Sequence, residues 1–160
     1  SNVGADESKA NLSLSSFWIM VMVGRLLTAL VFAPMIVLEV NGAWFILVLA
    51  LISAIILFAM TKINSVAVGG ICVMVLGLLF APIFPTVLGL LFSRTDPALQ
   101  GTAFGLVFAV GLAGAIFVPA WMGSMSAGKG IKASMAIAGG TAVLLVIIAA
   151  LMGIMLPPLA

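Results

Sequence analysis

The sequence has no histidine, one cysteine, and only six basic and four acidic side chains in 160 residues. Without histidine, histidine-based metal sites and catalytic dyads are excluded. Cys72 lies alone inside an apolar run, so no disulfide can form within the chain, and we expect an inert, buried thiol. No nucleophile, acid pair or metal cluster lies at a plausible depth. We therefore expect neither an enzyme nor a bound cofactor or metal.

What the chain has in excess is apolar surface, because 65% of its residues are hydrophobic and its mean hydropathy is +1.46. Soluble domains use roughly 45–50% apolar residues, and a soluble fold of this length could not bury the surplus. A lipid bilayer can accommodate it, since a helix needs only about 20 apolar residues to cross. The few charges are too scattered for a nucleic-acid surface. We therefore expect an all-α integral membrane protein whose main partner is the lipid bilayer.

Five apolar runs predict five membrane-spanning helices and no β-sheet. Short polar turns and loops separate them, and Gly123–Gly130 is the loosest of these loops. Residues 1–16 are small and polar and are expected to form an exposed tail. Residues 157–160 are the carboxy-terminal end, where Pro157 and Pro158 stop any helix. The predicted spans are residues 17–38, 43–60, 65–92, 102–123 and 131–156.

The third run contains two prolines, Pro82 and Pro85, partway along an apolar helix. Each proline removes a backbone donor and clashes with the preceding turn. Membrane helices tolerate this defect where neighbouring helices satisfy the freed carbonyl groups, and such a bend often lies beside a cavity or pathway. The prolines therefore belong either to a moving, gating helix that lines a pathway or to a fixed kink that serves packing.

Arg25 interrupts the first run at its ninth position, about 12 Å inside the helix end at 1.5 Å per residue. An ion at that depth is costly and usually faces the bundle interior. Its guanidinium offers a planar fork of donors that suits a carboxylate or an oxyanion. Arg25 is therefore either a residue that binds an anionic substrate or a partner's carboxylate, or a structural arginine bonded to carbonyl groups or a partner helix.

The fourth run is rich in small residues, which allow close approach of helices inside membranes. Its glycines predict that this helix packs against protein, with a hinge as the alternative. These helix-packing positions are Gly101, Gly105, Gly111 and Gly114.

An odd number of spans places the two chain ends on opposite sides of the membrane. The side of the amino-terminal tail collects Lys9, Lys62, Lys129 and Lys132, whereas the other side has only Arg94. The positive-inside rule then predicts a cytoplasmic amino terminus.

Three short motifs follow one another along the chain. They are Phe17-Trp18 with Gly24-Arg25-Leu26-Leu27, then Gly77 with Ala81-Pro82-Ile83-Phe84-Pro85-Thr86, then Gly101-Thr102-Ala103-Phe104-Gly105-Leu106. In this order and spacing they resemble the carboxy-terminal half of a major facilitator superfamily transporter, from its eighth to its twelfth helix. The likeness covers about residues 16–156. It is greatest to the fucose-permease-like and other sugar or small-anion branches.

The resemblance implies a permease or symporter portion of a bacterial inner membrane, working by alternating access together with a missing amino-terminal half. The substrate would be a sugar or a small organic anion. Arg25 would look into the central cavity, with Phe84, Thr86 and Phe108 among the cavity neighbours. The family's topology places the start of its eighth helix at the outer face, which is opposite to the orientation from the charge count.

The sequence also departs from the family. No acidic residue lies in a span, so a proton-coupling carboxylate would have to come from outside this chain. The family's seventh helix has no counterpart, and the acidic and basic pattern expected after Gly24-Arg25 is missing. These departures favour an alternative, a non-transporting integral membrane subunit that reuses the half-fold as a scaffold or assembly element in a larger complex.

Overall fold

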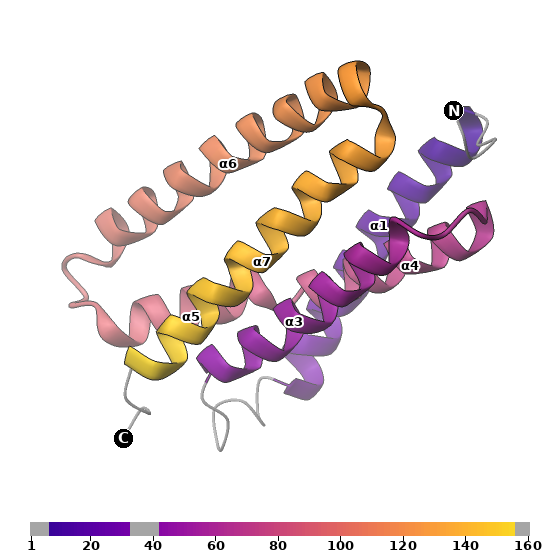
Figure 1. Cartoon of the computed structure of the whole chain (residues 1–160). Helices are drawn as coiled ribbons and strands as arrows, with labels where there is room; N and C mark the ends of the chain where they lie inside the picture. Colours follow the sequence, from indigo (N-terminus) through magenta and orange to yellow (C-terminus); the bar gives the residue numbers. More distant parts are fainter. Residues whose placement is uncertain (1–6, 33–41, 156–160) are drawn as a thin grey trace.

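A computed structural model describes residues 7–32 and 42–155, and these ranges form an all-α membrane protein. Five helices, one of them interrupted, are long and apolar enough to cross a membrane, as predicted. The helices are α1 Glu7–Leu27 with the π-helical turn η1 Thr28–Phe32, α3 Gly42–Met60, α4 Val66–Phe80, α5 Ile83–Arg94, α6 Gln100–Lys129 and α7 Ile131–Met155 (Figure 1). The helices α4 and α5 are the two parts of the third span, Val66–Arg94.

The first helix begins at Glu7, ten residues before the predicted start at Phe17, so the expected tail is helical from residue 7 onward. No proline or glycine interrupts the sequence between Glu7 and Phe17, and a glutamate in the first turn is favourable at the positive end of the helix dipole. The apolar span within this helix and its π-helical turn is Asn11–Leu30. The predicted residues beyond Phe32 lie outside the described part of the chain.

The fourth helix is longer than predicted, because α6 continues through the expected loop Gly123–Gly130 as far as Lys129. Glycine is tolerated inside membrane helices, where no water competes for the backbone groups. The Ser124 hydroxyl also donates a hydrogen bond back to the Trp121 carbonyl oxygen. The helix ends only at Gly130, whose φ of 85° is a conformation that favours glycine. The second and fifth spans begin and end within one residue of their predicted limits inside the described range.

Helices α3 and α7 form one antiparallel layer of the bundle. A Cβ added at Gly153 would lie 3.3 Å from the Trp44 ring, and one at Gly139 would lie 3.1 Å from the Phe58 ring. The largest buried cluster joins this layer to α5 and consists of Ala43, Ile46, Leu90 and Ala149. Small buried residues at such crossings let membrane helices approach closely.

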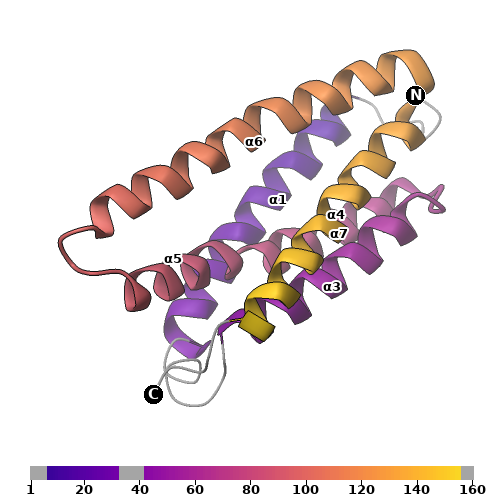
Figure 2. The same cartoon turned by 60° about the vertical axis from the view of Figure 1, so that its left-hand side comes forward.

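Helices α1 and α4 form a second, parallel pair, and α3 packs against both parts of the third span. In contrast, α6 contacts α7 and the end of α5, runs along the outside of the bundle, and has no buried residue (Figures 1 and 2). The protein therefore has a packed part, α1 with α3, α4, α5 and α7, and one helix that the rest of the described chain does not cover.

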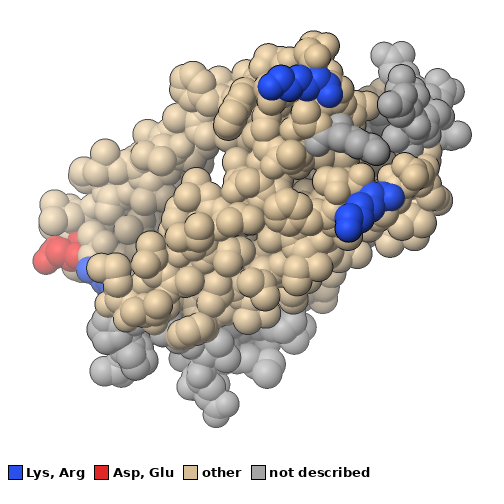
Figure 3. Space-filling model, viewed as in Figure 1, with Lys and Arg blue, Asp and Glu red and all other residues tan. Residues whose placement is uncertain are grey.

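On the face seen in Figure 3, the charged side chains lie at the two ends of the bundle. The start of α1, the α3–α4 turn and the α6–α7 turn lie together at one end, where Ser13, Asn64 and Lys129 line a common recess. Arg94 and Asp96 lie at the other end, in the turn between α5 and α6. Residues 9, 62, 129 and 132, which the sequence groups on one side, thus lie at one end of the fold.

Candidate functional site

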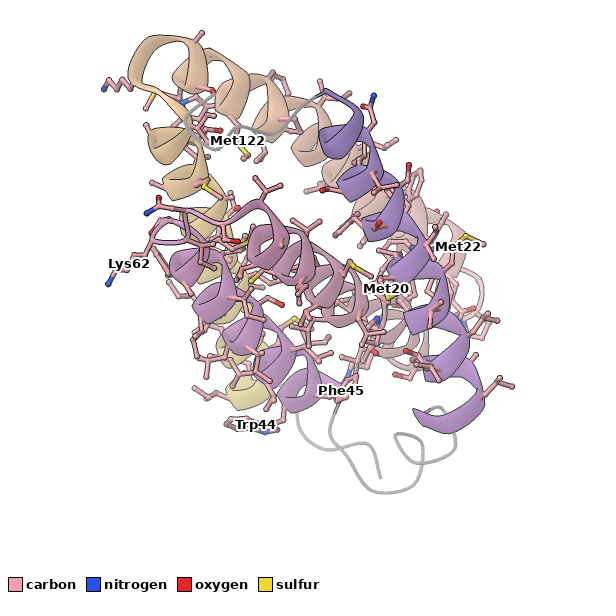
Figure 4. All side chains as sticks on the ribbon, turned by 90° about the vertical axis from the view of Figure 1, so that its right-hand side faces the viewer. Met20, Met22, Trp44, Phe45, Lys62 and Met122 are labelled. Atoms are coloured by element: carbon pink, nitrogen blue, oxygen red, sulfur yellow. The ribbon has the colours of Figure 1, made fainter. Side chains whose placement is uncertain are left out.

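Helices α1 and α4 cross closely at two glycines. A Cβ at Gly24 would lie 2.5 Å from the Ala81 Cβ, and one at Gly77 would lie 2.6 Å from the Phe17 carbonyl oxygen. Met20 is turned toward α4 at this crossing, whereas Met22 points away from the bundle (Figure 4). Neither glycine could carry a side chain without displacing backbone, so the two glycines allow this contact.

The third span is interrupted at this same crossing. Helix α4 ends at Phe80, α5 begins at Ile83, and Pro82 precedes the first residue of α5. Ala81 and Pro82 are buried, and the Leu78 carbonyl oxygen, which the missing proline donor leaves free, would lie 3.1 Å from a Cβ at Gly24. The break therefore lies directly against Gly24 of α1.

The two prolines contribute differently to the break. Pro85 is the third residue of α5, where the backbone N–H would have no intrahelical partner, so it costs no hydrogen bond. The Pro82 carbonyl oxygen accepts hydrogen bonds from the Thr86 backbone N–H and, at 2.7 Å, from the Thr86 hydroxyl. Pro82 therefore causes the interruption of the helix. A gating role of Pro82 or Pro85 stays a prediction.

Arg25 follows Gly24 directly and lies in the last turn of α1, in the second half of the span Asn11–Leu30. It lies about 7 Å along the helix axis from Leu30. Its side chain is exposed and makes no hydrogen bond or ion pair with another residue of the described ranges. The neighbouring Thr28 is buried, and its hydroxyl donates a 2.7 Å hydrogen bond to the Gly24 carbonyl oxygen. The α1 backbone around Arg25 is therefore fixed, while the guanidinium itself is accessible.

The other residues expected around Arg25 contact different parts of the bundle. Thr86 is half-buried and places its methyl group against Gly42 of α3, while Phe84 on the same helix is 40% exposed. Phe108 stacks on Phe104 with ring centroids 5.5 Å apart, and Phe104 in turn lies beside Phe92 of α5. The described contacts thus do not join these residues into one lined cavity with Arg25.

The glycines expected to pack α6 meet nothing inside the described chain. A Cβ at Gly101, Gly105, Gly111 or Gly114 would have no atom within 4 Å. Gly111 lies on the face of α6 that turns toward the bundle, between the half-buried Val107 and Val118, and is open nonetheless. Met122 also points from α6 toward the bundle interior (Figure 4). Packing of these glycines against another molecule stays a prediction.

Sequence reasoning gave Gly77 no role of its own, although it is as tightly enclosed as Gly24. The signal was the spacing: pairing Gly24 with Ala81 in parallel helices places Met20 beside Gly77. The recess at the lysine end was also missed, because it needs helix α1 and two turns from distant parts of the chain to meet.

No protein-family model, curated protein or solved structure matches this chain.

Proposed function

We propose that this chain is part of a secondary membrane transporter of the major facilitator type, which carries a sugar or small organic anion by alternating access together with helices outside this sequence. The observation that carries the proposal is the break in the third span at Ala81–Pro82. The break packs against Gly24, and Arg25 is the next residue of α1. Interrupted membrane helices are the usual place where transporters bind substrates and ions. A charge within a span is costly and marks functional positions.

Of the two substrate classes, the structure favours the small organic anion. The guanidinium of Arg25 is permanently charged and offers paired donors that match a carboxylate. No described residue occupies those donors. A neutral sugar would leave the charge uncompensated in the membrane, whereas an anion compensates it.

The experiment compares ligand-induced stabilisation of the purified chain with that of two Arg25 variants in mild detergent. Small carboxylates and neutral sugars of similar size are added, and the unfolding temperature is measured. A ligand at about 100 times its Kd stabilises the native state by about 2.7 kcal/mol. We expect carboxylates to raise the unfolding temperature of the wild type, to do so less for Arg25→Lys, and to have no effect on Arg25→Gln.

Arg94→Gln is the matched control, because it removes an arginine at the end of the bundle and should leave the stabilisation intact. Equal stabilisation of the wild type and Arg25→Gln would overturn the anion-binding role. If no carboxylate or sugar stabilises any form, the alternative of a non-transporting subunit is favoured, and α6 with no buried residue would be its assembly helix.

A further inference from the structure

A recess of about 350 Å³ opens at the lysine end of the bundle, toward the other end of α1 from Arg25. It lies between Ser13 of α1, the α3–α4 turn and the α6–α7 turn. The spans that border it end or begin here, at Met60, Val66 and Lys129. In a bilayer these positions fall at the level of the lipid headgroups, so the recess opens where hydrocarbon meets water.

The lining of the recess is divided into a polar part and an apolar part. Asn64, Ser65 and Lys129 supply polar groups, whereas Val73 and Met135 supply apolar surface. The ends of membrane spans commonly carry such polar groups, but here they surround a hollow large enough for a small ligand. The recess thus suits a molecule with one polar and one apolar end.

The charge around the recess is positive. Lys129 lines it, is exposed, and forms no hydrogen bond or ion pair with any residue of the described ranges. Lys62 belongs to the same end but points outward (Figure 4) and does not line the recess. The sequence places two further lysines, Lys9 and Lys132, in the first turns of α1 and α7 at this end. Figure 3 shows two regions of basic side chains at this end of the bundle.

Two helices also begin at the recess, which adds unpaired backbone donors. Ser65 precedes α4 without a side-chain cap, so the first-turn N–H groups of α4 have no intrahelical partner. At the start of α7 the Ala133 N–H donates to the Gly130 carbonyl oxygen, which leaves fewer donors there. Helices α3 and α6 end beside them. The Phe58 and Ala59 carbonyl groups of α3 accept hydrogen bonds from the Thr61 and Lys62 N–H groups, and the Ser126 carbonyl group of α6 accepts one from the Gly130 N–H. The recess therefore offers backbone donors and a cation.

We propose that this recess binds the phosphate of an anionic phospholipid headgroup, with Lys129 as its main cationic contact and the acyl chains running along α4 and α7. Basic pockets between membrane helices at the headgroup level bind anionic lipids in this way. Free phosphate shares the polar chemistry, but it has no use for the apolar lining of Val73 and Met135. The proposal is independent of the transport function, because none of its residues takes part in that site.

The test measures lipid retention by native mass spectrometry after exchange into micelles with equal amounts of phosphatidylglycerol and phosphatidylcholine. The wild type should retain phosphatidylglycerol preferentially. Lys129→Gln should lower this preference about fivefold, which corresponds to roughly 1 kcal/mol for one lysine near a membrane surface. Lys129→Arg should keep it. Gly69→Leu should abolish it, because a Cβ at Gly69 has nothing within 4 Å and the side chain grows into the recess.

Two control variants separate the recess from general surface charge and from general effects of bulk. Lys62→Gln removes a lysine at the same end outside the recess, and Gly140→Leu adds the same bulk in open space on α7. Both should leave the preference unchanged. An equal loss in Lys62→Gln and Lys129→Gln, or full retention in Lys129→Gln, would overturn the proposal. Displacement of the lipid by millimolar inorganic phosphate would assign the site to free phosphate and would overturn the proposal of a lipid site.

Discussion

The crossing of α1 with α4 and the outer helix α6 both contain glycines, and the structure uses them in opposite ways. At the crossing, Gly24 and Gly77 have no room for a Cβ. Along α6, which has the same proportion of glycine as α4, Gly105 and Gly111 face open space. Glycine content alone therefore does not locate a helix contact. A contact requires a partner helix whose small residues or carbonyl groups meet the glycine in register.

The largest expected effect on stability comes from adding one methyl group to a glycine in each of these two regions. Gly77→Ala would place a Cβ 2.6 Å from the Phe17 carbonyl oxygen, which is backbone and cannot turn aside. We expect a loss of about 2 kcal/mol in the free energy of unfolding, as for other overpacked positions. Gly111→Ala meets no atom and should be neutral or gain up to about 1 kcal/mol from helix propensity. Unfolding by denaturing detergent in mixed micelles measures both, and equal effects would show that the crossing is not as tight as described.

The sequence predicts much of this fold because membrane spans carry a strong signal. The limits of α3 and α7 follow directly from uninterrupted apolar runs. The start of α1 and the end of α6 do not, because serine and glycine allow a membrane helix to continue and only Gly130 adopts a conformation that ends it. Composition distinguishes apolar from polar segments, but it does not say where a tolerant polar segment stops being helical.

The candidate site also has some features that the sequence predicts and others that it does not. The sequence predicts a bend at Pro82 and Pro85, and the structure has an interruption at Pro82 and a close approach at Gly24. That these two features touch, and that Gly77 completes the crossing, depends on the parallel register of α1 and α4. The resemblance placed Thr86 near Arg25, yet the described contact of Thr86 is with Gly42. Register between distant segments is a property of packing that no local pattern contains.

A second prediction concerns the open inner face of α6. In the proposed transporter, other helices of the carrier cover this face. Gly111→Leu should then leave the chain folded, because the position is open, but should weaken assembly about tenfold, which corresponds to roughly 1.4 kcal/mol. Light scattering in mild detergent over a concentration series measures the association. Gly140→Leu, with the same added bulk on α7, should assemble as the wild type does; a wild type that stays a stable monomer with no partner would contradict the prediction.

The smallest expected effect lies in the packed layer of α3. Ser53 is fully buried, and its hydroxyl has no hydrogen-bond partner among the described residues. Ser53→Ala should raise the free energy of unfolding by about 1 kcal/mol, because it removes a buried polar group with no partner. Thr28→Ala is the opposite case, because the buried Thr28 hydroxyl donates a hydrogen bond to the Gly24 carbonyl oxygen. This substitution should lower the free energy of unfolding by about 1 kcal/mol. Destabilisation by Ser53→Ala in the same unfolding assay would indicate that this hydroxyl has a partner outside the described chain.

If the proposed transport function is right, Arg25 faces a water-accessible path beside the broken span and not the lipid. Val21, Gly24 and Thr28 mark the face of α1 that is buried in the bundle. At 100° per residue, Arg25 borders that face and Leu26, which is 62% exposed, lies on the opposite side of the helix.

The most direct measurement is thiol labelling at these two positions in a Cys72→Ala background, which removes the chain's only native cysteine. A water-soluble maleimide reacts with the thiolate, which forms in water and not in hydrocarbon. We predict that Arg25→Cys is labelled in proteoliposomes, while Leu26→Cys stays unlabelled. No labelling of Arg25→Cys, or equal labelling at both positions, would contradict the account.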